Sequence, residues 1–460
     1  MSRLNPAVRL TSFLVLSVLV VVACGEETSP ITTSDGARST STTSGGATRT
    51  SIPANDIQAE IDWFVAVLNG EELTEREYEE RFDEAFRQQV PFAEGFQPVL
   101  DQFRPAGPFT VTERGGEGSQ GEAIVEAADG TRARVLGELD DQGRFVALVI
   151  QPVTPTVDDP PENIEESRER LAELGHLGMV TAEIVDGLCV SGEDVSGSEP
   201  VPLGSAIKLY VLAALGEAIE TGAVAWDDEV EIEGELKSVP TGILQDRPAG
   251  DMVTVREMAE LMISISDNTA TDHLIDLLGR ENVEAVMGEY GHTSPELNIP
   301  LLNTRELIAL KIGPASGLHV QWLQGGEQER RNLLDQISDI TPADLPVQEW
   351  TEPIEPDTVE WFASPNDLCT LAIGLIELSE SQPEVGEILA LNPGVPATPG
   401  TWERIWFKGG AEPGLLAVWW VTESQGRTFV TAGSVVNPET ALDADEAALL
   451  FAAIRDLLAP

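Results

Sequence analysis

The chain has 460 residues, too many for one ordinary domain, so two domains and a tail are expected. Asp and Glu total 79 against 27 Lys and Arg, and the resulting net charge of -52 argues against a nucleic-acid partner, whose phosphates would be repelled. Lysine is rare, and the chain contains only Lys208, Lys237, Lys311 and Lys408. A lysine that falls in a recognisable pattern is therefore informative.

The first 23 residues are predicted to be a lipoprotein signal peptide. Arg3 and Arg9 give it a positive start, and the apolar run over residues 10–23 is too short for a stable transmembrane helix. Val21-Val22-Ala23-Cys24 resembles a bacterial lipobox, which implies cleavage before Cys24 and a diacylglycerol on its thiol. The alternative is an ordinary secretory signal in which Cys24 is incidental. We expect an exported protein with a lipid anchor at the outer face of the cytoplasmic membrane.

Residues 24–55 are predicted to form a disordered stalk. They consist largely of Thr, Ser, Gly and Ala, and have too little apolar bulk to bury a core. Such a stalk would hold the folded part away from the lipid.

Residues 56–153 are predicted to form a small α+β domain. A helical apolar stripe begins at Ile57, and Thr74-Glu75-Arg76-Glu77 is a capping box that opens a second helix. Helices followed by a curled antiparallel sheet resemble the cone of steroid isomerases and nuclear transport factors. The segment has no His, Lys or Cys, so we expect a packing or substrate-shaping role for it. The buried helical face is predicted to continue through Tyr78, Phe82 and Phe86, and strands are predicted over residues 109–112, 121–127, 131–138 and 145–151, with turns at Asp129-Gly130 and Gln142-Gly143.

Residues 154–162 read as a Pro- and Asp-rich linker to a larger domain, residues 163–460. That domain is predicted to open with a helix over 164–174 and a strand pair over 177–190.

Two cysteines remain if Cys24 is lipidated. Cys189 and Cys369 both lie in apolar stretches, and outside the cell they could form a disulfide or stay buried and unpaired; the sequence leaves both open. Neither has the spacing of a metal site, and we expect no metal and no cofactor.

Residues 204–215 are nearly all apolar but include Ser205 and Lys208. Apolar residues on every side of the helical wheel predict a buried helix, in which an ammonium must be paired or neutralised. Ser205 and Lys208 are three residues apart on one helix face, close enough for the amine to take a proton from the hydroxyl. Alternatively, Ser-x-x-Lys is a common tetrapeptide and Lys208 simply reaches the surface.

Two further segments carry polar groups next to apolar runs. Ser266-Asp267-Asn268 follows a predicted helix whose buried stripe is Met258, Leu261, Met262 and Ile265, and precedes a second helix over residues 269–278. By itself the tripeptide would be read as a helix cap. Lys408 ends a predicted aromatic strand just before Gly409 and Gly410, where it could offer positive charge to an anionic substrate.

Taken together, Ser205-x-x-Lys208, Ser266-Asp267-Asn268 and Lys408-Gly409-Gly410 resemble the S-x-x-K, S-D-N and K-T-G motifs of class A β-lactamases and penicillin-binding proteins. The segments 238–242 and 262–272 are similar to a branch of serine hydrolases from clavulanic acid gene clusters and related lipoproteins. That branch carries a small steroid-isomerase-like domain in front. The resemblance implies an α+β fold, an antiparallel sheet flanked by helices, with an all-helical lobe between Lys208 and the final strands.

The resemblance also implies roles for the motif residues. Ser205 would be the nucleophile and Lys208 its base, while Ser266 would pass a proton to the leaving group. Asn268 would hold a substrate amide and position Lys208. Lys408 would attract a substrate carboxylate.

The implied oxyanion hole consists of the N–H groups of Ser205 and Ala411, with Gly409 and Gly410 lining the substrate. Gly409 departs from the family threonine, whose hydroxyl helps to bind a β-lactam carboxylate. The position of the deacylating glutamate, four residues before Asn298, holds Ser294, and Glu296 is the nearest acid.

We therefore predict a monomeric serine acyl hydrolase of the class A β-lactamase type, which acts on a small acyl or β-lactam-like molecule through an acyl-enzyme on Ser205. We expect an esterase or amidase with weak β-lactam turnover. The alternatives are a true β-lactamase, a peptidoglycan carboxypeptidase and, from a different class, a non-catalytic ligand-binding lipoprotein.

Overall fold

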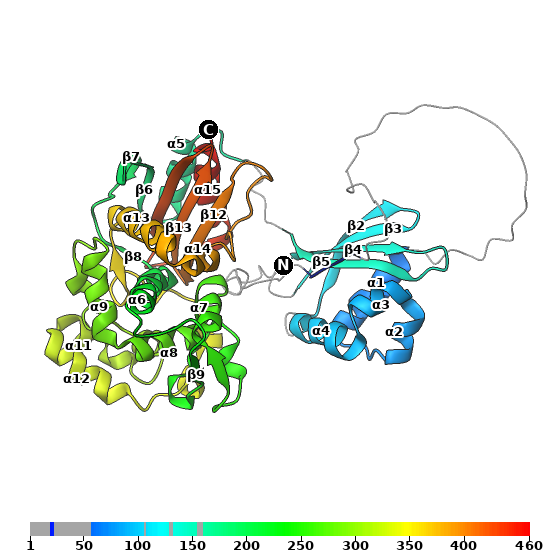
Figure 1. The fold of residues 1–460 in the computed structure, drawn as a ribbon, viewed down its shortest axis with the longest axis horizontal. Coiled ribbons are helices and arrows are strands. Elements are labelled where there is room, and N and C mark those ends of the chain that lie inside the picture. The colour runs from blue at the N-terminus through cyan, green and yellow to red at the C-terminus, as the bar shows by residue number, and fades with distance from the viewer. Residues whose placement is uncertain (1–18, 23–56, 105–106, 128–131, 154–159) are drawn as a thin grey trace, which may run out of the picture. The chain divides into compact units, whose positions relative to one another are not determined.

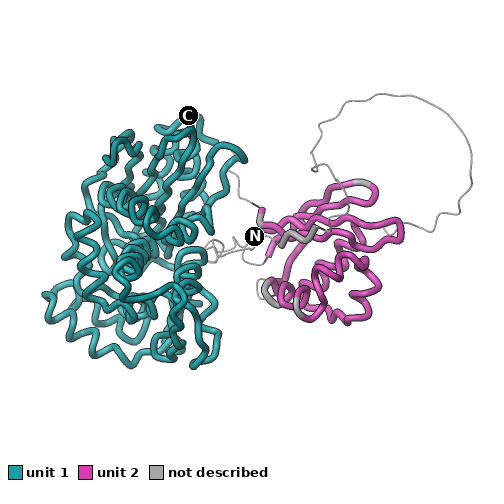
Figure 2. The backbone as a smooth tube through the Cα atoms, in the orientation of Figure 1, with its two compact units in different colours: residues 1–15, 155–460 teal, residues 16–154 magenta. Residues whose placement is uncertain are grey.

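The computed structural model describes residues 19–22, 57–104, 107–127, 132–153 and 160–460, which fall into two compact units (Figures 1 and 2). The division between the units lies at residues 154 and 155. The predicted lipidation site Cys24, the stalk and the turn at Asp129-Gly130 are outside the described residues. Within the described ranges, no helix combines the length and apolar character needed to cross a bilayer.

The smaller unit is an antiparallel sheet with helices that lie in the chain between its first strand and its other four strands. Its strands are ordered β1-β5-β4-β3-β2, and the four-residue strand β1 (Leu19–Val22) falls inside the predicted signal peptide. The elements are α1 (Ile57–Leu68), α2 (Glu75–Arg81), α3 (Glu84–Gln89), the π-helical turn η2 (Phe92–Phe96), α4 (Gln97–Phe103), β2 (Thr110–Glu117), β3 (Gln120–Glu126), β4 (Arg132–Leu139) and β5 (Phe145–Pro152).

The predicted second helix of this unit is two helices. The capping box of Thr74 and Glu77 opens α2 as predicted, but Asp83 caps a new helix, and Phe82 therefore ends α2 while Phe86 lies on α3. Tyr78, Phe82 and Phe86 are all buried in one aromatic core, as predicted. The likeness to a steroid-isomerase cone stays a prediction.

The larger unit is built on a five-stranded antiparallel sheet in the order β12-β13-β14-β6-β7. Strand β13 is buried on both faces: Trp419 and Val421 pack with the helical part of the unit, while Val418 and Trp420 pack with α5 and α15. Burial on both faces explains why its sequence is a continuous apolar run. The elements of this sheet layer are α5 (Ile164–Leu174), β6 (His176–Val185), β7 (Leu188–Val195), β12 (Arg404–Glu412), β13 (Leu415–Ser424), β14 (Arg427–Val436) and α15 (Ala444–Leu457).

Helices and a few short strands make up the chain between β7 and β12 of this sheet (Figure 1). The implied architecture, a flanked antiparallel sheet with a helical insertion after Lys208, is thus observed. The inserted elements are the 3₁₀ turn η4 (Gly204–Ile207), α6 (Lys208–Glu220), α7 (Val255–Ser264), α8 (Asn268–Leu278), α9 (Arg280–Glu289), α10 (Thr304–Lys311), α11 (His319–Gln324), α12 (Glu327–Ile337), α13 (Pro365–Ser381) and α14 (Pro383–Leu389), with the short strands β8 (Val201–Pro202), β9 (Glu229–Glu231), β10 (Met252–Thr254) and β11 (Phe362–Ala363).

The sequence left the state of Cys189 and Cys369 open, and the structure joins them in a disulfide between β7 and α13. Their Cα atoms are 6.3 Å apart, within the range of ordinary disulfides. The bond ties the edge of the sheet to a helix 180 residues further along the chain.

Three predicted details are corrected. The helix expected from residue 204 begins as the 3₁₀ turn η4 and becomes α-helical at Lys208. The buried stripe of α7 contains Met258 and Met262 as predicted, whereas Leu261 and Ile265 are only partly buried, because the stripe runs through Val255, Ala259 and Ile263. Strand β12 continues through the two glycines to Glu412 instead of ending at Lys408.

Candidate active site

Ser205 lies at the start of a helix whose next residues are buried. Ala206, Ile207 and Lys208 are covered by the core, while Ser205 itself is half-buried. The first N–H groups of a helix have no acceptor within the helix, and the helix dipole gives them partial positive charge. Gly204 has φ of +48°, a left-handed conformation that favours glycine. The chain thus turns sharply to place the hydroxyl and the N–H of Ser205 together at the start of the helix.

The side chain of Lys208 is fully buried and ends among oxygen atoms. Its Nζ lies 2.6 Å from Ser266 O, 2.6 Å from Asn268 Oδ1 and 3.0 Å from Ser266 Oγ. Burial lowers the pKa of Lys208 to about 7, although the nearby carboxylates of Asp267 and Asp272 oppose the shift. A lysine with this pKa is neutral in about half of the molecules at pH 7 and can therefore act as a base.

Ser266 joins two lysines. It is a non-glycine residue with φ of +59°, and in this strained conformation its hydroxyl lies 3.0 Å from Lys208 Nζ and 3.1 Å from Lys408 Nζ. Lys408 also donates to Gly409 O at 2.7 Å, and burial together with the Lys208 charge holds the pKa of Lys408 well below its usual value. One hydroxyl can donate to one amine while accepting from the other. The three groups form a path along which a proton can move.

Asn268 is fixed by both ends of its amide. Its oxygen accepts from Lys208, and its nitrogen donates to Val239 O at 2.8 Å. Asp267, the middle residue of the motif, caps α8 by accepting from Ala270 N, as the helix-cap alternative proposed. It also accepts the N–H groups of Ile243 and Leu244, so it holds the neighbouring loop against the site.

The predicted contact between Ser205 and Lys208 is not formed. Among the described residues, the Ser205 hydroxyl has no hydrogen-bond partner. The three hydrogen bonds of the Lys208 amine go to Ser266 and Asn268 instead. The two residues share one side of the chain because positions i and i+3 eclipse in a 3₁₀ turn. Catalytic hydrogen bonds in a free enzyme often tighten only when substrate is bound. Proton transfer from Ser205 to Lys208 therefore stays a prediction.

Ser205 and Ala411 lie on backbone segments that touch. A Cβ on Gly410 would come within 2.4 Å of Ser205 N, and one on Gly204 would come 3.4 Å from Ala411 N. Glycine at position 410 is thus required for the close approach of β12 to η4. The arrangement brings the two predicted oxyanion-hole nitrogens together, with Ala411 exposed to solvent.

The structure gives a reason for Gly409. A Cβ at this position would lie 2.8 Å from the ring of Phe407, which is on the same side of β12 and packs on Trp420 with ring centroids 4.9 Å apart. A threonine could be accommodated only if this ring moved. The packing of the Phe407 ring therefore accounts for the glycine, and for the absence of a threonine hydroxyl, at position 409.

The predicted deacylation position itself holds a serine instead of a base. Ser294 is partly buried and its N–H binds His292, while Glu296 is exposed. Asn298 is buried and binds the backbone of Phe362 through both ends of its amide.

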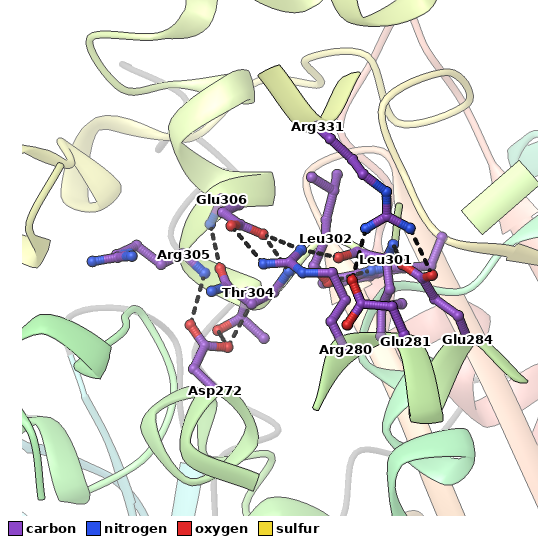
Figure 3. A network of polar contacts seen from close by, with 12 residues as sticks. Asp272, Arg280, Glu281, Glu284, Leu301, Leu302, Thr304, Arg305, Glu306 and Arg331 are labelled. Atoms are coloured by element: carbon purple, nitrogen blue, oxygen red, sulfur yellow. Dashed lines mark hydrogen bonds and ion pairs between the residues drawn. The ribbon is translucent and has the colours of Figure 1, made fainter. Parts of the chain in front are cut away.

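A network of charged and polar groups connects α8 to α9 and α10 (Figure 3). Asp272 accepts from Thr304 N at 2.8 Å and Thr304 Oγ1 at 2.7 Å, and that hydroxyl lies 3.3 Å from Asn268 O. Burial raises the pKa of Asp272 to about 6. Arg280 forms two 2.8 Å bonds to Glu306, which fixes the start of α10. The network links the helix that carries Asn268 to its neighbours.

Sequence reasoning missed a third buried lysine, besides Lys208 and Lys408. Lys311 ends the buried helix α10, and its side chain binds Glu360 and Glu412 in the interior. The signal was available, because Lys311 sits in the apolar stretch 307–312 just as Lys208 sits in its own. Lys237 braces the loop beside Ser266 by donating to Gln245 O at 3.0 Å.

Comparison with known proteins places two family profiles on different parts of the chain. Residues 175–348 match the beta-lactamase enzyme family, and residues 52–145 match the family of the ORF 12 gene product N-terminal region. The first match includes Ser205, Lys208, Ser266 and Asn268 and ends before Lys408.

The individual proteins that resemble this chain have low sequence identity to it. The chain is 30% identical over 135 residues to the beta-lactamase regulatory protein BlaB of Streptomyces cacaoi, a match to 28% of this chain and to 42% of that protein, so it spans less than half of that protein's length. The beta-lactamase of Sphaerobacter thermophilus DSM 20745 is 19% identical, with 64% of this chain and 95% of that chain covered and a TM-score of 0.46. A mutant of PBP-A, solved as an acyl-enzyme with penicillin G, is 20% identical, with 66% and 97% covered and a TM-score of 0.44.

Proposed function

We propose that the protein is a serine acyl hydrolase that forms an acyl-enzyme on Ser205. The observation that supports this most is the convergence of Lys208, Ser266, Asn268 and Lys408 beside the helix start that carries Ser205. Burying two amines 3.0 and 3.1 Å from one hydroxyl costs stability, and such a cost is typical of active sites. Labelling with a fluorescent penicillin tests the proposal, and the Discussion develops that test.

Acylation follows from the positions of these groups. Ser205 Oγ attacks the acyl carbonyl as neutral Lys208 removes its proton. Negative charge then develops on the carbonyl oxygen, where the N–H groups of Ser205 and Ala411 can stabilise it. Ser266 donates a proton to the leaving group and is then reprotonated through the two lysines. Each step uses a group that lies at the site in the free protein.

Deacylation needs a further group, a base that holds a water molecule against the acyl carbonyl. Ser294 cannot act as a base at neutral pH, and Glu296 is exposed. Losing a positioned general base lowers a rate by roughly 10²- to 10⁴-fold, or about 2.7 to 5.5 kcal/mol in barrier. The acyl-enzyme should therefore accumulate.

We expect a β-lactam adduct to persist for minutes after a single exposure. Intact-protein mass spectrometry during reaction with a chromogenic cephalosporin measures its lifetime directly. Glu296→Gln is the matched variant and should leave the lifetime unchanged. Steady turnover of hundreds per second that is lost in Glu296→Gln would show instead that Glu296 performs deacylation.

Two other functions use the same site. A true β-lactamase or a peptidoglycan carboxypeptidase would also acylate Ser205, and both would require faster deacylation than the site offers. A non-catalytic ligand-binding lipoprotein would have no need for two buried lysines that share one serine hydroxyl. The arrangement around Ser266 therefore favours an enzyme over a binding protein. Slow deacylation is the reason to propose an ester or amide hydrolase that turns over β-lactams weakly.

We further propose that the protein is exported and anchored in the cell envelope through Cys24, on the basis of Val21-Val22-Ala23-Cys24. Cys24→Ala should move the protein from the membrane fraction to the soluble fraction, as followed by immunoblotting of separated cell fractions. Wild-type protein in the soluble secreted fraction would contradict the proposal.

A further inference from the structure

Three ionisable side chains lie buried next to the site and contact one another. Lys311, at the end of α10, binds Glu360 Oε1 at 3.1 Å and also binds Glu412. The side chains of Lys311 and Glu360 are completely buried, and that of Glu412 is 5% exposed. We call Lys311, Glu360 and Glu412 the buried triad. A group of charges this deep in a protein is costly to form, and its position needs a reason.

The buried triad contacts both backbone segments of the predicted oxyanion hole. Glu360 Oε2 accepts from Gly204 N at 3.1 Å, directly before Ser205. Glu412 follows Ala411 on β12. A continuous chain of bonds therefore runs from Gly204 through Glu360 and Lys311 to Glu412, the residue next to Ala411.

The same two segments also touch directly, through Gly204 and Gly410. The direct contact sets how close η4 and β12 can come, and the triad opposes their separation. In acyl-transfer enzymes, oxyanion stabilisation requires N–H donors that already lie roughly 2.7–3.1 Å from the oxygen on which the negative charge develops. Small changes in the spacing of the two N–H groups would therefore reduce the rate.

We propose that the buried triad is a positioning device that sets the spacing of the Ser205 and Ala411 N–H groups. This inference rests on the proposed acyl-enzyme function. Lys311, Glu360 and Glu412 do not touch the reacting atoms, and they act through the backbone that carries the oxyanion hole.

The charge state of the triad is consistent with this role. Burial raises the pKa of Glu412, with the Glu360 carboxylate acting in the same direction and Lys311 opposing it. The protonated form of Glu412 leaves one cation and one carboxylate, so the triad has no net charge. A neutral group beneath the hole does not repel the oxyanion.

Two substitutions of Glu412 separate positioning from simple stability. Glu412→Gln keeps an acceptor for Lys311 and resembles the protonated carboxyl, whereas Glu412→Leu has a similar size but cannot accept. We expect Glu412→Gln to acylate within about twofold of the wild type. In Glu412→Leu the acylation rate constant at saturating fluorescent penicillin should fall by about 10²-fold, the lower end for losing one oxyanion donor, while the dissociation constant of the probe stays unchanged.

The matched control is Arg455→Met, which removes another fully buried cation. Arg455 lies on α15, where it binds Val395 O at 2.6 Å and packs over Trp420. This variant should lower the melting temperature without changing the acylation rate constant. Should Glu412→Leu fail to fold, the charge-balanced double variant Lys311→Met with Glu360→Gln replaces it, with the same loss expected.

The outcomes distinguish the two proposals. Equal acylation rate constants for the folded Gln and Leu variants, or a double variant that acylates at the wild-type rate, would overturn the positioning role. Wild-type protein that is never acylated would instead overturn the proposed function.

Discussion

Ser205→Ala should abolish covalent labelling by a fluorescent penicillin, because it removes the one hydroxyl that lies at the helix start beside the predicted oxyanion hole. The substitution removes a single half-buried oxygen without a hydrogen-bond partner among the described residues, so folding should be unaffected. Gel fluorescence measures the label, and the melting temperature reports on the fold.

Ser264→Ala is the matched control for this experiment. Among the described residues its hydroxyl bonds only to Glu260 O, 2.6 Å away within the same helix, although Ser264 lies just two positions before Ser266. This variant should label at the wild-type rate. Labelling that persists in Ser205→Ala would place the nucleophile elsewhere.

The second large effect concerns the base. Lys208→Ala should slow acylation by roughly 10²- to 10⁴-fold, the range for loss of a positioned general base. Because the base must be neutral, the wild-type acylation rate should rise as the pH passes through about 7, the pKa of Lys208, and then level off. Stopped-flow labelling between pH 5 and 9, a range chosen to bracket the roughly neutral transition, measures both effects.

The pH profile separates a base from a merely structural lysine. In Lys208→Ala the rise near neutral pH should disappear, and added small primary amines should restore part of the rate. A variant that acylates slowly but keeps the wild-type pH profile would show that another group removes the proton.

Part of this site could be predicted from the sequence because its signals are local. Ser205 and Lys208 are three residues apart, and a lysine in an apolar helix is conspicuous when the chain has only four. Ser266, Asn268 and Lys408 were predicted through the family resemblance, and the structure brings all three to Lys208 or to its partner hydroxyl.

The remainder depends on contacts between distant positions. Lys311 shows the same anomaly as Lys208, but its partners Glu360 and Glu412 are 49 and 101 residues away, and no spacing rule connects them. The left-handed conformation of Ser266 is imposed by its surroundings, since a serine has no intrinsic preference for positive φ. The reason for Gly409 likewise becomes visible only when the ring of Phe407 is in place.

Fold prediction likewise succeeded where local patterns decide the structure and failed where contacts outside those patterns do. The capping box at Thr74 and the helix α5 were found from local patterns. The break after Phe82 was missed because the apolar spacing continues through it, while Asp83 starts a new helix. The continuation of β12 through two glycines depends on its pairing with β13, which overrides their weak strand preference.

The most direct test of the acyl-enzyme is to locate the adduct. The protein is treated with a fluorescent penicillin and digested, and the labelled peptide is sequenced by tandem mass spectrometry. Our account predicts one acyl group per chain, on Ser205. A label on any other residue, or no label on folded protein, would contradict it.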